Sequence, residues 1–394
     1  MKKYLFLLLL FGVSTLLKGQ DSLQIKMDSL LQAPMFETSQ VGLMVYDLTA
    51  DQVLYQHNAR QLMRPASTMK VLTAIAALDH LGGHHQLSTR IFYNGTLDNG
   101  KLTGDIYCVG GFDPMVTGDD VRALAQEIHL LGIDTLQGNI IEDHSMKEDL
   151  PYGEGWCWDD ENPKLRPLSI GRKDIFAQQL IQEMRRDNMV LQDVSIREGR
   201  CPEDASLIAF RSHNIDQLLQ RMMKKSDNFY AEALFYQVAR ALADQRTAKA
   251  ADACTAIKRL IKKVGLNEKD YRIADGSGLS LYNYVSAELE TKLLRYAWQN
   301  QRIYEHLYPS LPIAGVDGTL EKRMRKTAAE DNVHAKTGTL TGISSLAGYC
   351  LADNGHQLAF CIINQGIMRN QIGRDFQDRV CKLLCEPWGV SNEE

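Results

Sequence analysis

The sequence predicts an α+β fold whose main domain is interrupted by an inserted α/β domain. Three segments near the C-terminus, 332–338, 343–351 and 357–363, have the alternating apolar pattern of consecutive antiparallel strands. Helical patterns stand at both ends of the chain, and from about residue 88 strand and helix patterns alternate. An antiparallel sheet flanked by helices, with an all-helical part and an insertion, accounts for these patterns.

The main domain is expected to begin with a short helix, a hairpin and a second helix. The segments 41–47 and 53–57 predict two strands joined by a polar turn. A helix follows Pro65, because apolar residues recur there at helical spacing, and it ends at Gly82. Ser67 therefore lies in the first turn of a helix that is expected to be amphipathic.

The inserted α/β domain is expected at 88–165, between the main-domain segments 20–87 and 166–394. A Pro- and charge-rich stretch at 159–163 marks its exit, and a new helix begins near Arg172. The elements expected inside the insertion are two strands, a helix and a third strand, at 87–93, 101–109, 119–131 and 138–142.

The N-terminus has the layout of a signal peptide. Basic residues at Lys2 and Lys3 precede an apolar stretch over 4–13, and small and polar residues follow by Gly19. The apolar stretch is shorter than the roughly 20 residues that a membrane span needs. We expect a signal peptide over 1–19 and an exported, periplasmic protein without a membrane span in the mature chain.

Composition narrows the classes of ligand. The formal net charge is −5, with 44 basic and 49 acidic residues interspersed, which argues against a nucleic-acid partner. Eight cysteines in an exported protein allow 105 pairings, and the sequence does not choose among them. No Cys-x-x-Cys spacing is present, so neither a metal nor another cofactor is expected.

Three short segments in a fixed order carry the chemistry. They are Ser67-Thr68-Met69-Lys70 at a helix start, Ser226-Asp227-Asn228 between two helical patterns, and Lys336-Thr337-Gly338 on a strand. Each segment alone is common, and a Ser-x-x-Lys is usually a helix N-terminus with a solvated lysine. Their joint occurrence, each on the type of element that acyl transfer at a serine requires, favours a catalytic role.

The first two segments predict a nucleophile with its base. A serine hydroxyl is a poor nucleophile until a base takes its proton, and a lysine can do so only when its ammonium form is disfavoured. Residues three apart on a helix share a face, so Lys70 is expected to reach Ser67. Ser226 is expected to relay a proton between Lys70 and a leaving amine, and Asn228 to bind a substrate carbonyl.

The third segment predicts the substrate-binding strand. Lys336 and Gly338 face the same way because strand side chains alternate, and the missing side chain of Gly338 lets a substrate approach the backbone. Thr337 and Thr339 are candidates for binding a carboxylate. The backbone N–H groups of Ser67 and Thr339 would form the oxyanion hole.

These motifs resemble those of the low-molecular-mass penicillin-binding proteins of the D-alanyl-D-alanine carboxypeptidase and endopeptidase type. The resemblance extends over nearly the whole mature chain and includes the segments 64–70, 109–114, 138–143, 275–280 and 311–320. It implies a main domain of the serine β-lactamase and transpeptidase type. It also implies peptidoglycan stem peptides as substrates, and an acyl-enzyme on Ser67 that penicillin and other β-lactams mimic.

The chain departs from that family pattern at the edge of the expected pocket. Leu281 follows the 275–280 segment where the family commonly has Arg, and Thr341 stands where a longer polar residue is frequent. The resemblance therefore leaves open which stem-peptide residue is preferred. Asp143 resembles a family acidic residue near the site, although an exposed loop carboxylate is the expected interpretation.

Three alternatives remain at this stage. A β-lactamase carries the same three motifs, but it commonly needs a dedicated Glu to deacylate, and no such loop is evident. A silent wall-binding module on the same fold is disfavoured by the intact motif residues. A Ser-His-Asp triad through His334 is disfavoured because no Gly-x-Ser-x-Gly segment surrounds a serine.

Overall fold

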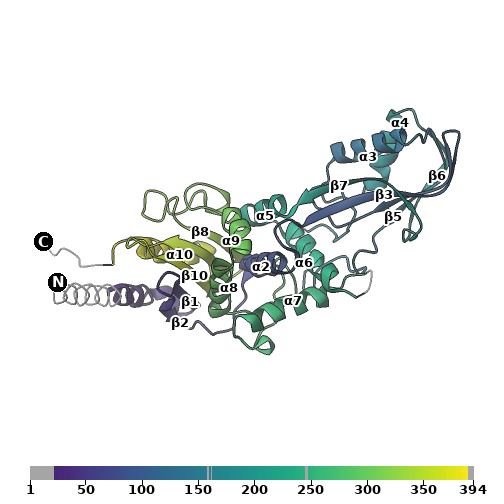
Figure 1. The fold of residues 1–394 in the computed structure, drawn as a ribbon. Coiled ribbons are helices and arrows are strands. Elements are labelled where there is room, and N and C mark those ends of the chain that lie inside the picture. Colours follow the sequence, from purple (N-terminus) through teal and green to yellow (C-terminus); the bar gives the residue numbers. More distant parts are fainter. Residues whose placement is uncertain (1–21, 158, 161, 245–246, 389–394) are drawn as a thin grey trace, which may run out of the picture.

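The computed structural model describes residues 22–157, 159–160, 162–244 and 247–388. It contains two five-stranded sheets, one in the main domain and one in the inserted domain, which projects from the main body (Figure 1). The predicted signal peptide lies outside the described residues. Over the described part of the chain, no helix combines the length and the apolar character that crossing a bilayer requires.

The main sheet is antiparallel, with the strand order β2-β1-β10-β9-β8. Pairing of β1 with β10 joins the N-terminal hairpin to the C-terminal meander, as the two predicted strand groups require. The sheet is buried on both faces, because residues 343–350 of β9 are all buried. The strands are β1 (Gln40–Asp47), β2 (Gln52–His57), β8 (His334–Leu340), β9 (Ile343–Leu351) and β10 (Gln357–Gln365).

Two hydrophobic cores cover the two faces of this sheet. On one face α10 (Asn370–Cys385) packs against β9 together with a helical segment over 22–30. On the other face lies the all-helical part, in which α2 (Met69–Leu81) is central. The surrounding helices are α5 (Ile215–Lys224), α6 (Asn228–Leu242), α7 (Ala250–Lys263), α8 (Ala287–Gln299) and α9 (Gln301–Ser310).

Helix α2 is buried on all sides rather than on one face. Every residue from Met69 to Leu78 is buried, so the expectation of an amphipathic helix is wrong for this stretch. A helix surrounded by other helices needs apolar or small residues all round, and Ala74, Ala76 and Ala77 meet that need. This burial holds the start of the helix, and Ser67 with it, in a fixed position.

The inserted domain contains a mixed sheet with the order β6-β5-β4-β3-β7. Strand β3 pairs antiparallel with β4 and β7, whereas β4, β5 and β6 run parallel. Two helices, α3 (Gly118–Leu130) and α4 (Phe176–Arg186), share a hydrophobic core with the sheet. The strands are β3 (Gln86–Asp98), β4 (Lys101–Val109), β5 (Thr135–Asp143), β6 (Val190–Glu198) and β7 (Ser206–Asn214).

The sheet topology corrects the expected exit from the insertion at residue 165. Helix α4 and strands β6 and β7 complete the second sheet and its core, so the inserted unit extends to Asn214, the N-cap of α5. Strand β6 is largely exposed and lacks clear apolar alternation, which explains why its pattern was too weak to predict. Residues 159–160 and 162–163 belong to no helix or strand, and they precede α4, β6 and β7, so they lie within the inserted unit rather than at its exit.

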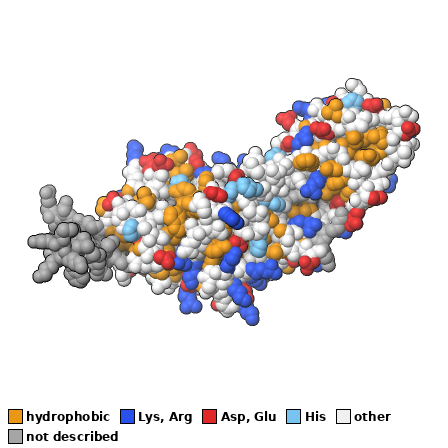
Figure 2. Space-filling view, viewed as in Figure 1, with side chains coloured by type: hydrophobic (Ala, Val, Ile, Leu, Met, Phe, Trp, Pro, Cys, Tyr) orange, Lys and Arg blue, Asp and Glu red, His pale blue; other side chains and the backbone are white. Residues whose placement is uncertain are grey.

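Surface charge is mixed, as the composition indicates. Figure 2 shows acidic and basic side chains interspersed over the visible face. The eight cysteines all lie in the described part of the chain and are free thiols in this structure.

Candidate active site

Ser67 lies at the entrance to the central helix. It belongs to a single 3-10 turn, Ala66–Thr68, that leads directly into α2, and Ala66 adopts a left-handed backbone conformation with φ of 50°. The hydroxyl of Thr68 contacts Glu290 Oε1 at 2.8 Å and Pro65 O at 2.9 Å. The turn is therefore anchored on both sides of Ser67, whose own side chain remains partly accessible.

Lys70 makes three hydrogen bonds through Nζ. Its partners are Ser67 Oγ at 2.9 Å, Asn228 Oδ1 at 2.8 Å and Ser277 O at 2.7 Å. The last two are carbonyl oxygens and can only accept, whereas the serine hydroxyl can donate. A neutral amine has two N–H groups for the two carbonyls and one lone pair for the hydroxyl. The geometry thus suits a lysine that accepts the proton of Ser67.

Burial supports the neutral form of Lys70. The side chain is fully buried, and this desolvation lowers its pKa from 10.5 to about 8. Asp275, Glu232 and Asp227 act in the opposite direction and raise the pKa, but by less than burial lowers it. A base with a pKa near the working pH combines a useful free-base population with adequate proton affinity. Lys70 meets both conditions beside the hydroxyl that it would deprotonate.

The Ser226-Asp227-Asn228 segment lies between α5 and α6. Ser226 has a left-handed φ of 57°, and Asp227 is the N-cap of α6, where its side chain accepts the N–H of Phe229. Arg172 and Arg221 pair with the same carboxylate. Asp227 therefore has a structural role. It fixes Asn228 at the start of the helix, where the amide oxygen of Asn228 accepts a hydrogen bond from Lys70.

Lys336 holds the hydroxyl of Ser226. Its Nζ donates to Ser226 Oγ at 2.8 Å and to Thr337 O at 2.7 Å, and its side chain is fully buried. Burial, reinforced by the nearby charge of Lys70, lowers its pKa well below 10.5. The expected relay from Lys70 to Ser226 is thus modified, since the lysine hydrogen-bonded to Ser226 in this structure is Lys336.

Strand β8 passes directly beside the serine. A Cβ added at Gly338 would lie 2.0 Å from Ser345 Oγ, 2.7 Å from Pro65 O and 3.0 Å from Ser67 N. Only glycine fits there, but the reason differs from the expected one. Neighbouring segments of the same protein, rather than a substrate, occupy the space beside Gly338. The close approach aligns the backbone of β8 with the N–H of Ser67.

The two threonines of this strand differ in their surroundings. Thr337 is half-buried, and its hydroxyl contacts Thr319 Oγ1 at 2.7 Å. Thr339 is exposed. Thr319 belongs to the 311–320 segment that carries the family resemblance, so that segment reaches the strand of the predicted site.

Two buried carboxylates near Lys70 were missed by the sequence reasoning. Glu232 accepts the N–H groups of Gly276 and Ser277, and Asp275 accepts those of Gly278 and Ser280. Together they shape the loop whose Ser277 carbonyl receives the Lys70 hydrogen bond. A signal was available, because Glu232 interrupts a run of apolar residues one helical turn after Asn228.

The other residues singled out from the sequence lie outside this cluster of hydrogen bonds. The ring of His334 stacks on Tyr308, with centroids 4.3 Å apart. Asp143 is buried and accepts the N–H groups of Ser145 and Cys201, so the expectation of an exposed loop carboxylate is wrong. Leu281 and Thr341 are exposed.

Comparisons with known proteins agree with this description. A D-alanyl-D-alanine carboxypeptidase DacB from Haemophilus influenzae is 27% identical over 408 residues, which cover 82% of this chain and 85% of the relative. A D-alanyl-D-alanine carboxypeptidase from an Actinomadura species is 26% identical, with 86% and 80% covered. The crystal structure of penicillin-binding protein 4 (dacB) from H. influenzae superimposes with a TM-score of 0.82 at 25% identity, covering 90% of this chain and 98% of that one.

A family model accounts for almost all of the described chain. The model of the D-Ala-D-Ala carboxypeptidase 3 (S13) family matches residues 23–169 and 162–386. With the structural match, it confirms the predicted α+β fold with an inserted domain, the resemblance inferred from the motifs and the predicted class of serine hydrolase. The chain belongs to the D-Ala-D-Ala carboxypeptidase 3 (S13) family.

Proposed function

We propose that this protein is an exported, penicillin-binding serine carboxypeptidase that acts on peptidoglycan stem peptides through an acyl-enzyme on Ser67. It would release the terminal D-Ala, open D-Ala-containing cross-links, or do both. The observation that carries the proposal is the contact of 2.9 Å between Ser67 Oγ and the fully buried Nζ of Lys70. Family membership supports the type of reaction, and the site residues are assigned from their geometry.

Acylation begins when Lys70 takes the hydroxyl proton of Ser67. The Ser67 oxygen then attacks the carbonyl carbon of the penultimate D-Ala and forms a tetrahedral oxyanion, which the N–H groups of Ser67 and Thr339 stabilise. Ser226 gives its proton to the departing amine of the terminal D-Ala and is reprotonated by Lys336, with which it is already hydrogen-bonded. A water then attacks the ester carbonyl: the proton that it loses passes through Ser226 to Lys336, and the Ser67 oxygen leaves with the proton held by Lys70, so that both lysines and Ser67 return to their starting states.

Substrate binding uses the remaining motif residues. Asn228 would donate its amide N–H to a substrate carbonyl while its Oδ1 continues to accept the hydrogen bond from Lys70 Nζ. Thr337 and Thr339 would receive the terminal carboxylate, close to the positive charge of Lys336. Gly338 keeps the strand close enough to Ser67 for these contacts and the oxyanion hole to act on one substrate.

A β-lactamase commonly uses a dedicated Glu carboxylate to activate a deacylating water. The two fully buried glutamates near the site are unsuited to this task. Glu232 is engaged by backbone N–H groups, and Glu290 by Thr68 and Cys361. A long-lived acyl-enzyme with penicillin is therefore expected. A silent wall-binding module is disfavoured because the contact between Ser67 and Lys70 is already in a reactive arrangement.

Intact-mass spectrometry after incubation with benzylpenicillin tests the proposal. We expect one stable adduct, which peptide mapping places on Ser67, and its loss in Ser67→Ala but not in the control Ser212→Ala on strand β7. Rapid turnover to penicilloate would indicate a β-lactamase. Absence of any adduct on a folded protein would contradict an enzymatic role.

Two substrates then separate the possible activities. Release of D-Ala from a synthetic pentapeptide reports carboxypeptidase activity, and cleavage of purified cross-linked muropeptides reports endopeptidase activity. Ser67→Ala should abolish both activities. Failure of the wild-type protein to act on either substrate, despite acylation by penicillin, would contradict the proposed substrate class.

A further inference from the structure

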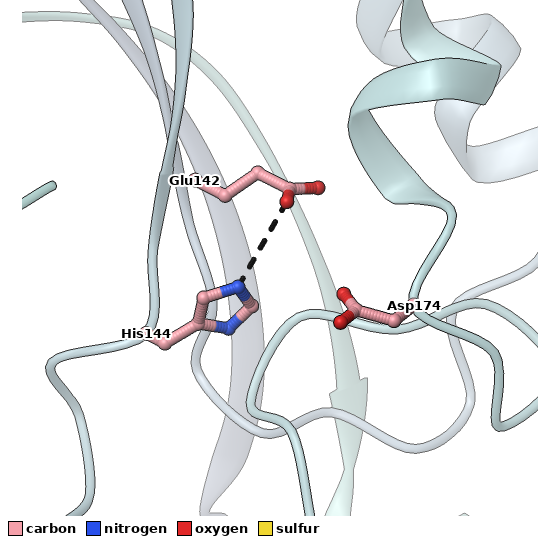
Figure 3. Close-up of side chains that lie close together, drawn as sticks. All are labelled: Glu142, His144 and Asp174. Carbon is pink, nitrogen blue, oxygen red and sulfur yellow. Dashed lines mark ion pairs between the residues drawn. The ribbon is translucent and has the colours of Figure 1, made fainter. Parts of the chain in front are cut away.

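The inserted domain contains a second cluster of chemically versatile side chains. Glu142 and His144 lie on the same side at the end of β5, and Asp174 precedes α4 by two residues. One ligand atom from each of the three lies within 4.8 Å of the others. Figure 3 shows the imidazole and the two carboxylates directed toward a common space.

The imidazole of His144 has no hydrogen-bond partner at either nitrogen. Both nitrogen atoms are buried, and Nε2 is 4.0 Å from Glu142 Oε2, too far for a hydrogen bond. A buried polar group without a partner is costly, and native proteins rarely keep one without a reason. A ligand that accepts the nitrogen lone pair and interacts with both carboxylates would remove this cost.

We infer that Glu142, His144 and Asp174 form a binding site for a divalent transition-metal ion of the Zn²⁺ type. Imidazole nitrogen and carboxylate oxygen are both zinc ligands, and three protein ligands leave a fourth tetrahedral position for water. This site departs from the expectation of no metal. Its ligands come from two distant segments, which no short spacing in the sequence could reveal.

The geometry requires only a small contraction. Ligand atoms about 2.0–2.2 Å from a tetrahedral zinc ion lie about 3.3–3.6 Å from one another. The 4.0 Å between His144 Nε2 and Glu142 Oε2 must therefore shorten by about 0.5 Å, and a separation at the 4.8 Å limit by at most about 1.5 Å. The side chain of Asp174 is 42% exposed and can move, whereas that of Glu142 is 8% exposed. The second oxygen of Glu142 accepts the N–H of Ala177 at 3.0 Å, which orients the carboxylate.

Arg166 is the competing cation at this cluster. Its guanidinium lies 3.6 Å from Asp174 Oδ2 and 3.5 Å from Glu198 Oε1. The two carboxylates and a neutral imidazole carry a charge of −2, which one divalent ion balances. Arg166 can stay paired with Glu198 and with the outer oxygen of Asp174. Glu142, His144 and Arg166 border a cavity of about 230 Å³, which has room for a water bound to the ion.

The site would connect the insertion to the active site. The loop that carries Asp174 also carries Arg172, whose guanidinium pairs with Asp227 at the N-cap of α6. A metal ion that ties this loop to β5 would hold Arg172 against Asp227 and so support Asn228. The inferred role is structural and goes beyond the proposed reaction, in which the ion takes no part.

Zinc binding to the full mature chain tests the inference. The protein is freed of metal with a chelator, titrated with ZnCl₂ by calorimetry, and its zinc content is measured after dialysis. We expect one equivalent with a Kd in the micromolar range or below, lost in both His144→Ala and Asp174→Ala. The control is His129→Ala, because His129 pairs with Asp134 at 3.3 Å in the same domain.

Thermal melting provides a second readout. Zinc at about a hundredfold excess over Kd should raise the Tm of wild type and His129→Ala by roughly 5 °C, and leave His144→Ala unchanged. Metal-free His144→Ala should melt close to metal-free wild type, which would show that the variant folds. Equal zinc content in wild type, His144→Ala and Asp174→Ala, or no zinc retained by wild type, would overturn the inference.

Discussion

Two buried lysines in this protein have the same lowered pKa but different surroundings. Burial lowers the pKa of both Lys70, in the main domain, and Lys147, which follows strand β5, to about 8. Lys70 contacts the hydroxyl of Ser67. Lys147 donates to the carbonyl oxygens of Glu148 and Leu150 and lies over the ring of Tyr236.

The comparison shows that a lowered pKa alone does not make a catalytic base. A neutral amine becomes useful when its lone pair faces a hydroxyl that can be deprotonated. Lys70 has such a hydroxyl, fixed by the buried start of helix α2, whereas the hydrogen-bond partners of Lys147 are acceptors. Geometry therefore distinguishes the two lysines where electrostatics does not.

The largest expected effect comes from removing each amine in turn. Lys70→Met should slow acylation by benzylpenicillin about 10³-fold, because Ser67 loses its base. Lys147→Met, the same change at a second buried lysine, should leave the rate within about twofold, because Lys147 contacts none of the residues proposed to react. Stopped-flow acylation rates of folded variants measure both. Similar losses in the two variants would remove the distinction between these lysines.

A methyl group at Gly338 should have the next largest effect. Gly338→Ala places a Cβ 2.0 Å from Ser345 Oγ and 2.7 Å from Pro65 O, so strand β8 must move away from Ser67. A displacement of about 1 Å in an active site can cost roughly 10²-fold in rate. The matched control is Gly118→Ala at the start of α3, where the methyl meets only the movable end of Gln179. Near-normal acylation by Gly338→Ala would contradict this account of the strand.

The carboxylates around each lysine allow a smaller, sharper test. Glu232 raises the pKa of Lys70, and Glu148 is the main group that raises the pKa of Lys147. Burial raises the pKa of Glu232 itself to about 8, so its charge acts on Lys70 mainly near and above that pH. Glu232→Gln keeps an acceptor oxygen for Gly276 and Ser277, but the lost charge should shift the upper part of the pH profile of acylation to lower pH. Glu148→Gln should leave the profile unchanged. A shift in both variants, or in neither, would argue against Lys70 as the titrating group.

The smallest expected effect is on stability. Burial raises the pKa of Glu290 to about 7. The stability from this group is therefore fully present below pH 4.5 and is lost as the pH rises through about 7. Glu290→Gln lacks this titration, so its Tm relative to wild type should rise by a few degrees between pH 5 and pH 8. A constant Tm difference across this range would show that the carboxyl is not protonated in the folded protein.

Much of this architecture was predictable from the sequence. The strands of the main sheet follow clear apolar alternation, and the three motifs occupy the helix start, interhelical turn and strand expected for them. Ser67 and Lys70 are close because positions three apart near a helix start share a face. Local periodicity was sufficient for these features.

The parts that escaped prediction depend on contacts between distant segments. The hydrogen-bond donor to Ser226 is Lys336, 110 residues away in the sequence. The backbone carbonyl that accepts a hydrogen bond from Lys70 belongs to Ser277, 207 residues away. Strand β6 is an exposed edge without apolar alternation, so the boundary of the insertion was placed too early. Such features follow from tertiary packing, which a single sequence does not encode in short patterns.

The central claim is that neutral Lys70 is the base for Ser67, and the pH dependence of acylation tests it most directly. The second-order rate constant for benzylpenicillin should rise about tenfold per pH unit at low pH and level off near pH 8, where Lys70 loses its proton. A rate constant that is independent of pH between 6 and 9, or one that still rises tenfold per unit toward pH 10, would contradict the claim.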